Sequence, residues 1–167
     1  MIDVVVVENR QLFLDGTIAL LEKEDDIQVV GKAMNYEQAV QQIQEKHVDV
    51  VVVDTDMPVD DGFKTITFIK KNFPHMKILV LTAVMYEEQV LRALCNGVDG
   101  YLISSQFAGK LAPRIREIIF GETFFSGDVA RRLEMHGYQL TKREIDIAYL
   151  LLQKYTNQQI SNKLYIS

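Results

Sequence analysis

The sequence contains few of the residues on which several common classes of protein depend. In 167 residues it has one cysteine, no tryptophan, three prolines and three histidines. The single cysteine, Cys95, excludes an internal disulfide framework and a zinc site built from several cysteines. The histidines, His47, His75 and His136, share no metal-ligand spacing. Composition therefore argues against a disulfide-rich secreted protein and against a zinc protein.

Long apolar runs are absent too, and none approaches the roughly 18 residues that a membrane-spanning helix needs. The first residues, MIDV, lack the basic segment, apolar segment and cleavage site of a secretory signal. Glycine-rich phosphate loops, dinucleotide fingerprints and serine nucleophile elbows are also missing. Apolar residues still make up 48% of the chain, which is enough for a folded core. We therefore expect a cytoplasmic globular protein with no membrane partner.

Charge is distributed unevenly along the chain. Residues 1–120 hold 18 acidic and 12 basic residues, whereas residues 121–167 hold 5 acidic and 6 basic ones. Neither part has the clear basic excess that is typical of a strong nucleic-acid surface. The asymmetry indicates two regions with different roles.

Short β-branched runs recur through the first 120 residues, and most are continuously apolar rather than alternating. This pattern is typical of strands buried on both faces, as in a parallel sheet. Apolar residues at helical spacing lie between the runs, and Asn35, three residues before Gln38, marks one helix start. Residues 1–121 are thus predicted to form a doubly wound α/β domain around a five-stranded parallel sheet. The runs are Val4–Val7, Ile27–Val30, Val50–Val53, Ile78–Leu81 and Tyr101–Ile103.

The pattern changes after residue 121. Residues 122–139 are interpreted as a linker with a short helix around Val129–Glu134. Residues 141–144 (TKRE) fit a capping box, in which a threonine hydroxyl and a glutamate satisfy the free amides of a helix start. Residues 156–159 (TNQQ) repeat this cap before Ile160 and Leu164. Two short helices in succession predict the beginning of a helix-turn-helix over residues 140–167.

Oxygen-bearing side chains stand at the ends of four predicted strands. Glu8 and Asn9 follow the first, Asp54 the third and Ser104 the fifth, while Thr82 ends the fourth. Ligands of doubly wound sheets bind beyond the carboxyl ends of the strands. Carboxylates suit Mg²⁺, and a carboxylate beside such a metal can act as a nucleophile toward a phosphoryl group. A single loop aspartate is more typical of a turn, so this hypothesis depends on convergence at one edge.

These segments resemble the receiver domain of bacterial two-component response regulators, and with the tail they resemble the LuxR/NarL class of transcription regulators. The resemblance implies the flavodoxin-like strand order 2-1-3-4-5, followed by a LuxR-type helix-turn-helix that is cut short. The segments that carry it are residues 4–9 (VVVVEN), 50–58 (VVVVDTDMP), 61–62 (DG), 79–83 (LVLTA), 97–102 (GVDGYL) and 140–145 (LTKREI).

The resemblance also implies residue roles. Asp54 is expected to be the phosphoacceptor. Thr82 and Tyr101 fall on the switch positions, where a hydroxyl turns toward the phosphoryl group and an aromatic ring changes rotamer. The expected Mg²⁺ ligands are Glu8, Asn9, Asp54 and the backbone carbonyl of Asp56.

The pocket departs from the family pattern in two places. The family has two acids after the first strand, whereas this chain has Glu8 and Asn9, and the lost charge should weaken Mg²⁺ binding. The family has a lysine after the fifth strand, whereas this chain has Ser104, and a hydroxyl cannot replace that charge. We interpret Arg10 as a solvated side chain on the first turn of a helix; the alternative is a replacement cation in the pocket.

Two further features bear on assembly. Pro113 lies inside the last helix of the domain by periodicity, so that helix either starts near Ala112 or kinks, and the dimer geometry is left open. The chain ends at Ser167, where the recognition helix would begin. We expect the natural chain to continue; a gene product without the reader is the alternative. The candidates for DNA-backbone contacts, or for a solvated helix surface, are Lys142, Arg143, Lys154 and Lys163.

Two functions from different classes follow. In the first, a histidine kinase phosphorylates Asp54, a homodimer forms and DNA binding shifts, provided that the chain continues beyond Ser167. In the second, an atypical receiver acts as a phosphate-independent interaction or dimerisation module. An enzyme with a transient aspartyl phosphate is set aside, because no further acid–base group supports it. We expect a signalling protein with at most weak self-phosphorylation and dephosphorylation.

Overall fold

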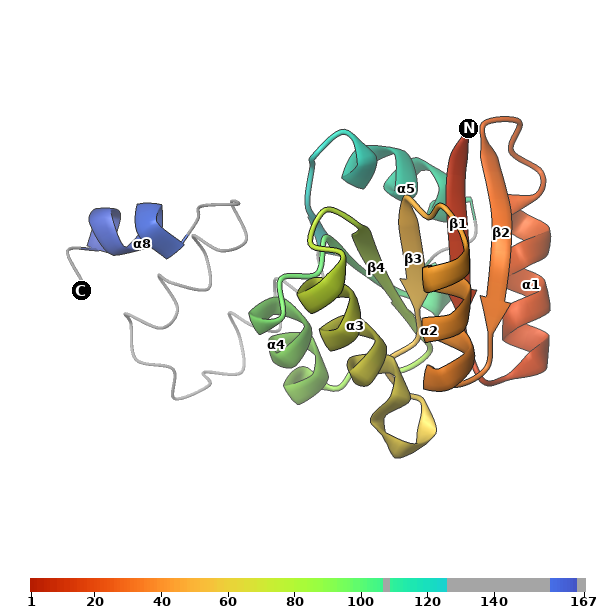
Figure 1. Ribbon diagram of the computed structural model, residues 1–167, viewed down its shortest axis with the longest axis horizontal. Coiled ribbons are helices and arrows are strands. Elements are labelled where there is room, and N and C mark those ends of the chain that lie inside the picture. Colours follow the sequence, from red (N-terminus) through yellow and green to blue (C-terminus); the bar gives the residue numbers. More distant parts are fainter. Residues whose placement is uncertain (107–108, 126–156, 165–167) are drawn as a thin grey trace.

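The computed structural model of the chain describes residues 1–106, 109–125 and 157–164. A parallel sheet lies between two layers of helices (Figure 1). The strands are β1 (Ile2–Val7), β2 (Ile27–Ala33), β3 (Val50–Val53), β4 (Lys77–Thr82), β5 (Gly100–Ile103) and β6 (Phe124–Phe125). The helices of this domain are α1 (Gln11–Leu21), α2 (Tyr36–Glu45), α3 (Asp61–Asn72), α4 (Glu87–Cys95) and α5 (Leu111–Ile119), with short 3₁₀ helices at Pro58–Asp60 and Ser104–Gln106.

The strands follow the order β2-β1-β3-β4-β5-β6, and every pairing is parallel. The first five confirm the predicted 2-1-3-4-5 sheet. β6 is an addition, because it pairs with β5 in residues that the sequence analysis placed in the linker. A segment of two residues is too short to show a strand pattern, and only its position beside the open edge of β5 makes it a strand.

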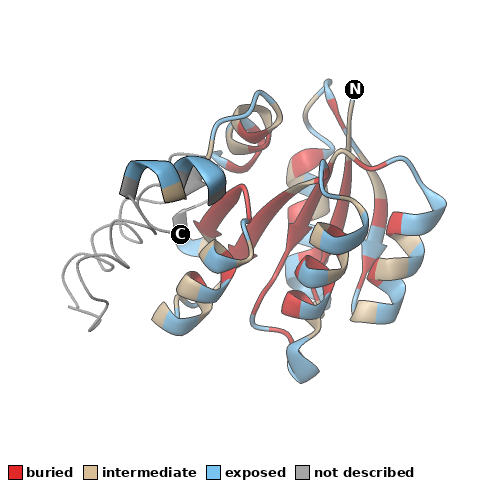
Figure 2. Cartoon of the chain, turned by 60° about the vertical axis from the view of Figure 1, so that its left-hand side comes forward, coloured by how far each residue is buried: buried red, intermediate tan, exposed pale blue. Residues whose placement is uncertain are grey.

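The valine runs of β1 and β3 are buried because these strands are covered on both faces, whereas the edge strand β2 exposes Gln28 and Lys32. Val4 and Val6 pack with α1 and α5, whereas Val5 and Val7 pack with α2, α3 and α4. Successive side chains of a strand point to opposite faces, so one run supplies both cores. Figure 2 shows the central strands mostly buried, and only the first residues of β1 and β4 are half-buried. The prediction of strands that are apolar on both sides is therefore confirmed for the inner strands, and it is wrong for the edge strand β2.

The structure shows where α2 and α5 begin, the two helix starts for which the sequence made a prediction. The Asn35 side chain accepts a hydrogen bond from the Gln38 amide at 2.9 Å, which confirms the predicted cap of α2. α5 begins at Leu111, so Pro113 lies in its first turn. A proline is tolerated there because the amides of the first turn have no partner within the helix. Of the two possibilities, the start near Ala112 is confirmed.

The tail is described only over α8 (Asn157–Leu164), which confirms a helix at the predicted cap segment 156–159 and starts at its second residue. The predicted linker helix around Val129–Glu134 and the capping box at residues 141–144 lie outside the described residues. Among the described helices, none combines the length and apolar character needed to cross a bilayer.

Candidate functional site

The register of the central strands brings two carboxylates together. β1 and β3 pair with Val7 opposite Val53, so Glu8 and Asp54 leave the sheet side by side. The Asp54 amide donates to the Val7 carbonyl at 2.9 Å, which extends the ladder by one residue. Asp54 is 2% exposed and Glu8 is 6% exposed. The predicted convergence at the carboxyl edge is thus confirmed for these two groups.

Arg10 joins the two carboxylates. Its Nη2 lies 2.9 Å from Asp54 Oδ2 and 2.9 Å from Glu8 Oε2, and its Nε donates to Glu8 Oε1 at 2.9 Å. The guanidinium also lies over the Phe13 ring, with Cζ 4.2 Å from the ring centroid. The interpretation of Arg10 as a solvated side chain is wrong, and the alternative, a cation in the pocket, is confirmed. Two buried negative charges explain this, because leaving them unpaired is costly.

Burial and the charge of Arg10 shift the pKa of Asp54 in opposite directions. Desolvation raises the pKa of the Asp54 carboxyl, and the neighbouring charge of Glu8 adds to that rise. The Asp56 amide, which donates to Asp54 Oδ1 at 3.0 Å, and the Arg10 charge lower the pKa but do not cancel the rise. On Arg10 itself, the hydrogen bonds to Glu8 raise the pKa. The site is a partly desolvated carboxylate held by one cation and one amide.

The two switch candidates are both buried near this carboxylate. Thr82 is 1% exposed, and its hydroxyl donates to the Val84 carbonyl at 3.1 Å. The same hydroxyl also favours the ionised form of Asp54. Tyr101 is fully buried, and its hydroxyl makes no hydrogen bond of ordinary geometry among the described residues, although Thr55 lies near enough to lower its pKa against the effect of burial. Desolvation raises the pKa of Tyr101 to about 12.

The remaining predicted pocket residues differ in their placement. Asn9 is half-buried, and its Oδ1 atom is buried without a hydrogen-bond partner among the described residues. Asp56 is exposed, and its amide rather than its carboxylate contacts Asp54. Ser104 opens the 3₁₀ helix after β5 and is half-buried. Within the described part of the chain, no lysine and no arginine other than Arg10 forms an ion pair with Asp54.

The donor atoms of this pocket can be compared with those that Mg²⁺ prefers. Glu8 and Asp54 supply carboxylate oxygens, which are hard ligands and already share one cationic partner, Arg10. Asn9, the next residue after Glu8, adds an amide oxygen that has no hydrogen-bond partner among the described residues. Such a donor set fits a divalent cation that keeps several waters. The residues therefore fit Mg²⁺ in type and number, although Arg10 contacts two of the expected ligands.

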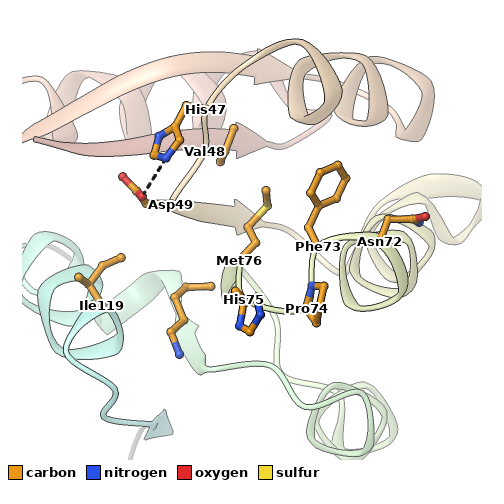
Figure 3. A pocket seen from close by; sticks show the side chains of 10 residues that line it. His47, Val48, Asp49, Asn72, Phe73, Pro74, His75, Met76 and Ile119 are labelled. Atoms are coloured by element: carbon orange, nitrogen blue, oxygen red, sulfur yellow. Dashed lines mark ion pairs between the residues drawn. The ribbon is translucent and has the colours of Figure 1, made fainter.

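A second group of side chains gathers at the opposite edge of the sheet. His47 Nδ1 lies 3.1 Å from Asp3 Oδ2, and its Nε2 lies 3.9 Å from Asp49 Oδ1, the pair joined by a dashed line in Figure 3. No sequence spacing indicates this group, because Asp3 is 44 residues away from His47 and only the sheet brings them together. Asp49 precedes β3 whereas Asp54 follows it, so the hollow in Figure 3 is separate from the Asp54 pocket.

Most of the candidate DNA contacts cannot be placed. Lys142, Arg143 and Lys154 lie outside the described residues. Lys163 lies in the last turn of α8 and is exposed. The structure therefore places one of the four candidates on a helix surface.

Comparison with known proteins supports the same interpretation. Residues 4–115 match the response regulator receiver domain family. The response regulator protein VraR of Staphylococcus epidermidis is 30% identical over 174 residues, which cover 99% of this chain and 83% of VraR.

Two solved structures are similar to this chain, and the matches cover nearly all of it. The response regulator ChrA of a heme-sensing two-component system has a TM-score of 0.68 at 29% identity and covers 99% of this chain and 82% of its own. A structure of two RcsB dimers bound to two parallel DNAs has a TM-score of 0.75 at 23% identity, covering 99% and 84%.

Proposed function

Because this chain belongs to the response regulators of two-component systems, we propose that its receiver domain accepts a phosphoryl group on Asp54 from a histidine kinase. The observation that supports this most directly is a buried carboxylate at the carboxyl edge of β3, beside Glu8 and with hydroxyls from neighbouring strands. In the reaction, an Asp54 carboxylate oxygen attacks phosphorus, the bond from phosphorus to the kinase histidine breaks, and an acyl phosphate forms.

The pocket residues have separate tasks in this proposal. Glu8, Asn9, Asp54 and the Asp56 carbonyl would hold Mg²⁺, which when bound offsets charge on the phosphoryl oxygens. The Asp56 amide orients the Asp54 carboxylate through its 3.0 Å hydrogen bond. Thr82, the last residue of β4, and Tyr101, buried within β5, would respond to the modified carboxylate.

The output proposed for the natural protein is a change in dimerisation and DNA binding. One relative of the same fold, RcsB, has a structure described as dimers bound to DNA. In this chain the same role requires a recognition helix beyond Ser167, and Lys142, Arg143, Lys154 and Lys163 are the candidate backbone contacts. A gain in dimer affinity on modification is the energetic requirement.

Intact mass measurement tests the phosphoacceptor directly. The protein is incubated with Mg²⁺ and a small acyl phosphate, and one phosphoryl adduct is expected. Asp54→Ala removes the adduct, whereas Asp56→Asn keeps it, because the Asp56 carboxylate is exposed and only its backbone serves the pocket. An adduct that survives in Asp54→Ala contradicts the proposal.

The ion pair between Arg10 and Asp54 favours a second candidate, a receiver that works without phosphate. Arg10 already supplies a cation to Asp54, and Ser104 adds no charge to the pocket. If no adduct forms and the oligomeric state is unchanged by the phosphodonor and Mg²⁺, this interaction or dimerisation module is the better assignment. Size-exclusion chromatography with light scattering provides that measurement.

A further inference from the structure

Arg10 takes up most of the oxygen atoms that a metal ion would use. The carboxylates of Glu8 and Asp54 offer four oxygens, and each accepts a hydrogen bond. Arg10 donates to three of them: its backbone amide and Nε to Glu8 Oε1, and its Nη2 to Glu8 Oε2 and Asp54 Oδ2. Only Asp54 Oδ1 is held by another group, the Asp56 amide. The guanidinium thus lies between the two carboxylates expected to bind Mg²⁺.

We propose that Arg10 is a tethered competitor of Mg²⁺, so that the metal binds this receiver only when the guanidinium leaves the Glu8–Asp54 pair. This inference rests on the Mg²⁺-assisted function proposed above and adds a regulator of that same site. It follows from electrostatics, because a guanidinium within hydrogen-bond distance of both carboxylates repels a divalent cation that approaches the same oxygens.

The surroundings of Arg10 hold its side chain near the pocket and also allow it to move into solvent. Residue 10 immediately precedes α1, and the Phe13 ring, one turn further on, lies against the guanidinium at 4.2 Å. The side chain is 34% exposed, whereas the Asp54 side chain is 1% exposed. The guanidinium can therefore move toward solvent while the carboxylates stay in place. Because the cation is part of the chain, its local concentration at the pocket does not fall on dilution.

The expected consequence is a weak apparent affinity for Mg²⁺. A ligand that binds only the open form has its dissociation constant increased by the inverse of the open fraction. The Mg²⁺ requirement of the receiver is then set by Arg10 as well as by the metal ligands. This effect is separate from the missing second acid at Asn9, which lowers the affinity of the open pocket itself.

Calorimetric titration of the unphosphorylated protein with MgCl₂ tests the competition without any phosphodonor. Arg10→Gln is expected to bind Mg²⁺ about tenfold or more tightly than the unsubstituted protein, which corresponds to a loss of roughly 1.4 kcal/mol of competing interaction. Arg10→Lys keeps a charge but not the forked geometry and is expected to be intermediate.

Arg116→Gln is the matched control. Arg116 also pairs with two acids, Glu24 and Asp26, but from α5 and at the other end of the sheet. Its affinity for Mg²⁺ should stay within about twofold of the unsubstituted protein. A change as large as that of Arg10→Gln would show a general charge effect and would overturn the proposal.

A second measurement keeps the proposal falsifiable if Arg10→Gln folds poorly. In the unsubstituted protein, the NMR signal of the Arg10 Nε–H group should shift during the Mg²⁺ titration with the midpoint found by calorimetry. The Arg116 signal should not shift. An Arg10 signal that is unchanged at saturating Mg²⁺, an equal or weaker affinity in Arg10→Gln, or no Mg²⁺ binding by either form would each overturn the inference.

The outcomes separate this inference from the proposed function. Tighter Mg²⁺ binding by Arg10→Gln without any adduct on Asp54 supports the competition and contradicts the phosphoacceptor role. An Asp54 adduct whose Mg²⁺ dependence is the same in both forms supports the phosphoacceptor role and contradicts the competition.

Discussion

Gly62 lies directly against the backbone of Asp54. A β-carbon on Gly62 would stand 2.1 Å from the Asp54 carbonyl oxygen and 2.9 Å from the α-carbon of Thr55. Both neighbours are main-chain atoms, so neither can rotate away. The absence of a side chain at Gly62 therefore allows the first turn of α3 to pack against the segment that presents the candidate phosphoacceptor.

Substitution of Gly62 is expected to be costly because of this contact. Gly62→Ala should lower the free energy of unfolding by about 2 kcal/mol, the cost typical of overpacking against fixed atoms. Gly16 is the matched control, because it lies within α1 with nothing near its missing side chain. Gly16→Ala should stabilise by about 0.5–1 kcal/mol through helix propensity. Urea unfolding followed by circular dichroism measures both; equal effects would contradict the packing argument.

Val59 is expected to be strained. It has φ 57° and ψ 21°, in the left-handed region, and it is 77% exposed within the short 3₁₀ segment Pro58–Asp60 between β3 and α3. This conformation costs a β-branched residue roughly 1–2 kcal/mol. Val59→Asn should raise the free energy of unfolding by about 1 kcal/mol, because asparagine tolerates this region.

Val84 serves as the control for that substitution. It is an exposed valine in the loop after β4, and it is not among the residues with positive φ. Val84→Asn should leave unfolding within about 0.5 kcal/mol of the unsubstituted protein. A stabilisation equal to that of Val59→Asn would indicate loss of exposed apolar surface rather than relief of strain.

The buried hydroxyl of Tyr101 should lower stability. It has no hydrogen-bond partner among the described residues, and an unsatisfied buried polar group is unfavourable. Tyr101→Phe is therefore expected to raise the free energy of unfolding by about 1 kcal/mol at neutral pH. Thermal or urea unfolding measures it. A loss of stability would mean that the hydroxyl makes a favourable contact in solution.

Tyr101 also predicts a pH dependence in the alkaline range. Burial raises the pKa of Tyr101 to about 12, so the unfolded chain, with a tyrosine pKa of about 10, ionises first. The stability contributed by the neutral phenol is fully present below pH of about 10 and is lost as the pH rises toward the folded value.

The measurement compares the free energy of unfolding of Tyr101→Phe with that of the unsubstituted protein over a range of pH. The stability advantage of Tyr101→Phe over the unsubstituted chain should be constant at neutral pH and should grow above pH of about 10. The other titratable groups contribute equally to the stability of both proteins, so their contributions cancel in the difference. An ultraviolet titration of tyrosinate should show one group near 12 that the variant lacks. A missing group that titrates near the ordinary tyrosine value would contradict the burial argument.

Restoring the family's charges should strengthen the pocket. Asn9→Asp adds a carboxylate beside the expected Mg²⁺ ligands, and Ser104→Lys adds a cation after β5. Asn9→Asp is expected to raise Mg²⁺ affinity about tenfold, and the double substitution should increase labelling of Asp54 by the acyl phosphate. If neither metal affinity nor labelling changes, the two departures do not explain the properties of this receiver.

Local pattern was sufficient for most of the fold and for the candidate nucleophile. Continuous valine runs indicate strands covered on both sides, and the residue after each run falls at the same sheet edge because parallel strands share a direction. The cap at Asn35 and the tolerated Pro113 depend on backbone groups within one turn, so neighbouring residues determine them. The two-residue strand β6 has no such local signal.

The sequence by itself determined the parallel sheet, its order through the family resemblance, and the position of Asp54 at the end of a strand, because these depend on periodicity and chain direction. Only the tertiary structure decided where Arg10 lies, why Gly62 must lack a side chain, and that Asp3 meets His47. Each of these is a contact between atoms whose position depends on packing, and a flexible arginine goes to whichever buried charges the completed fold leaves unpaired.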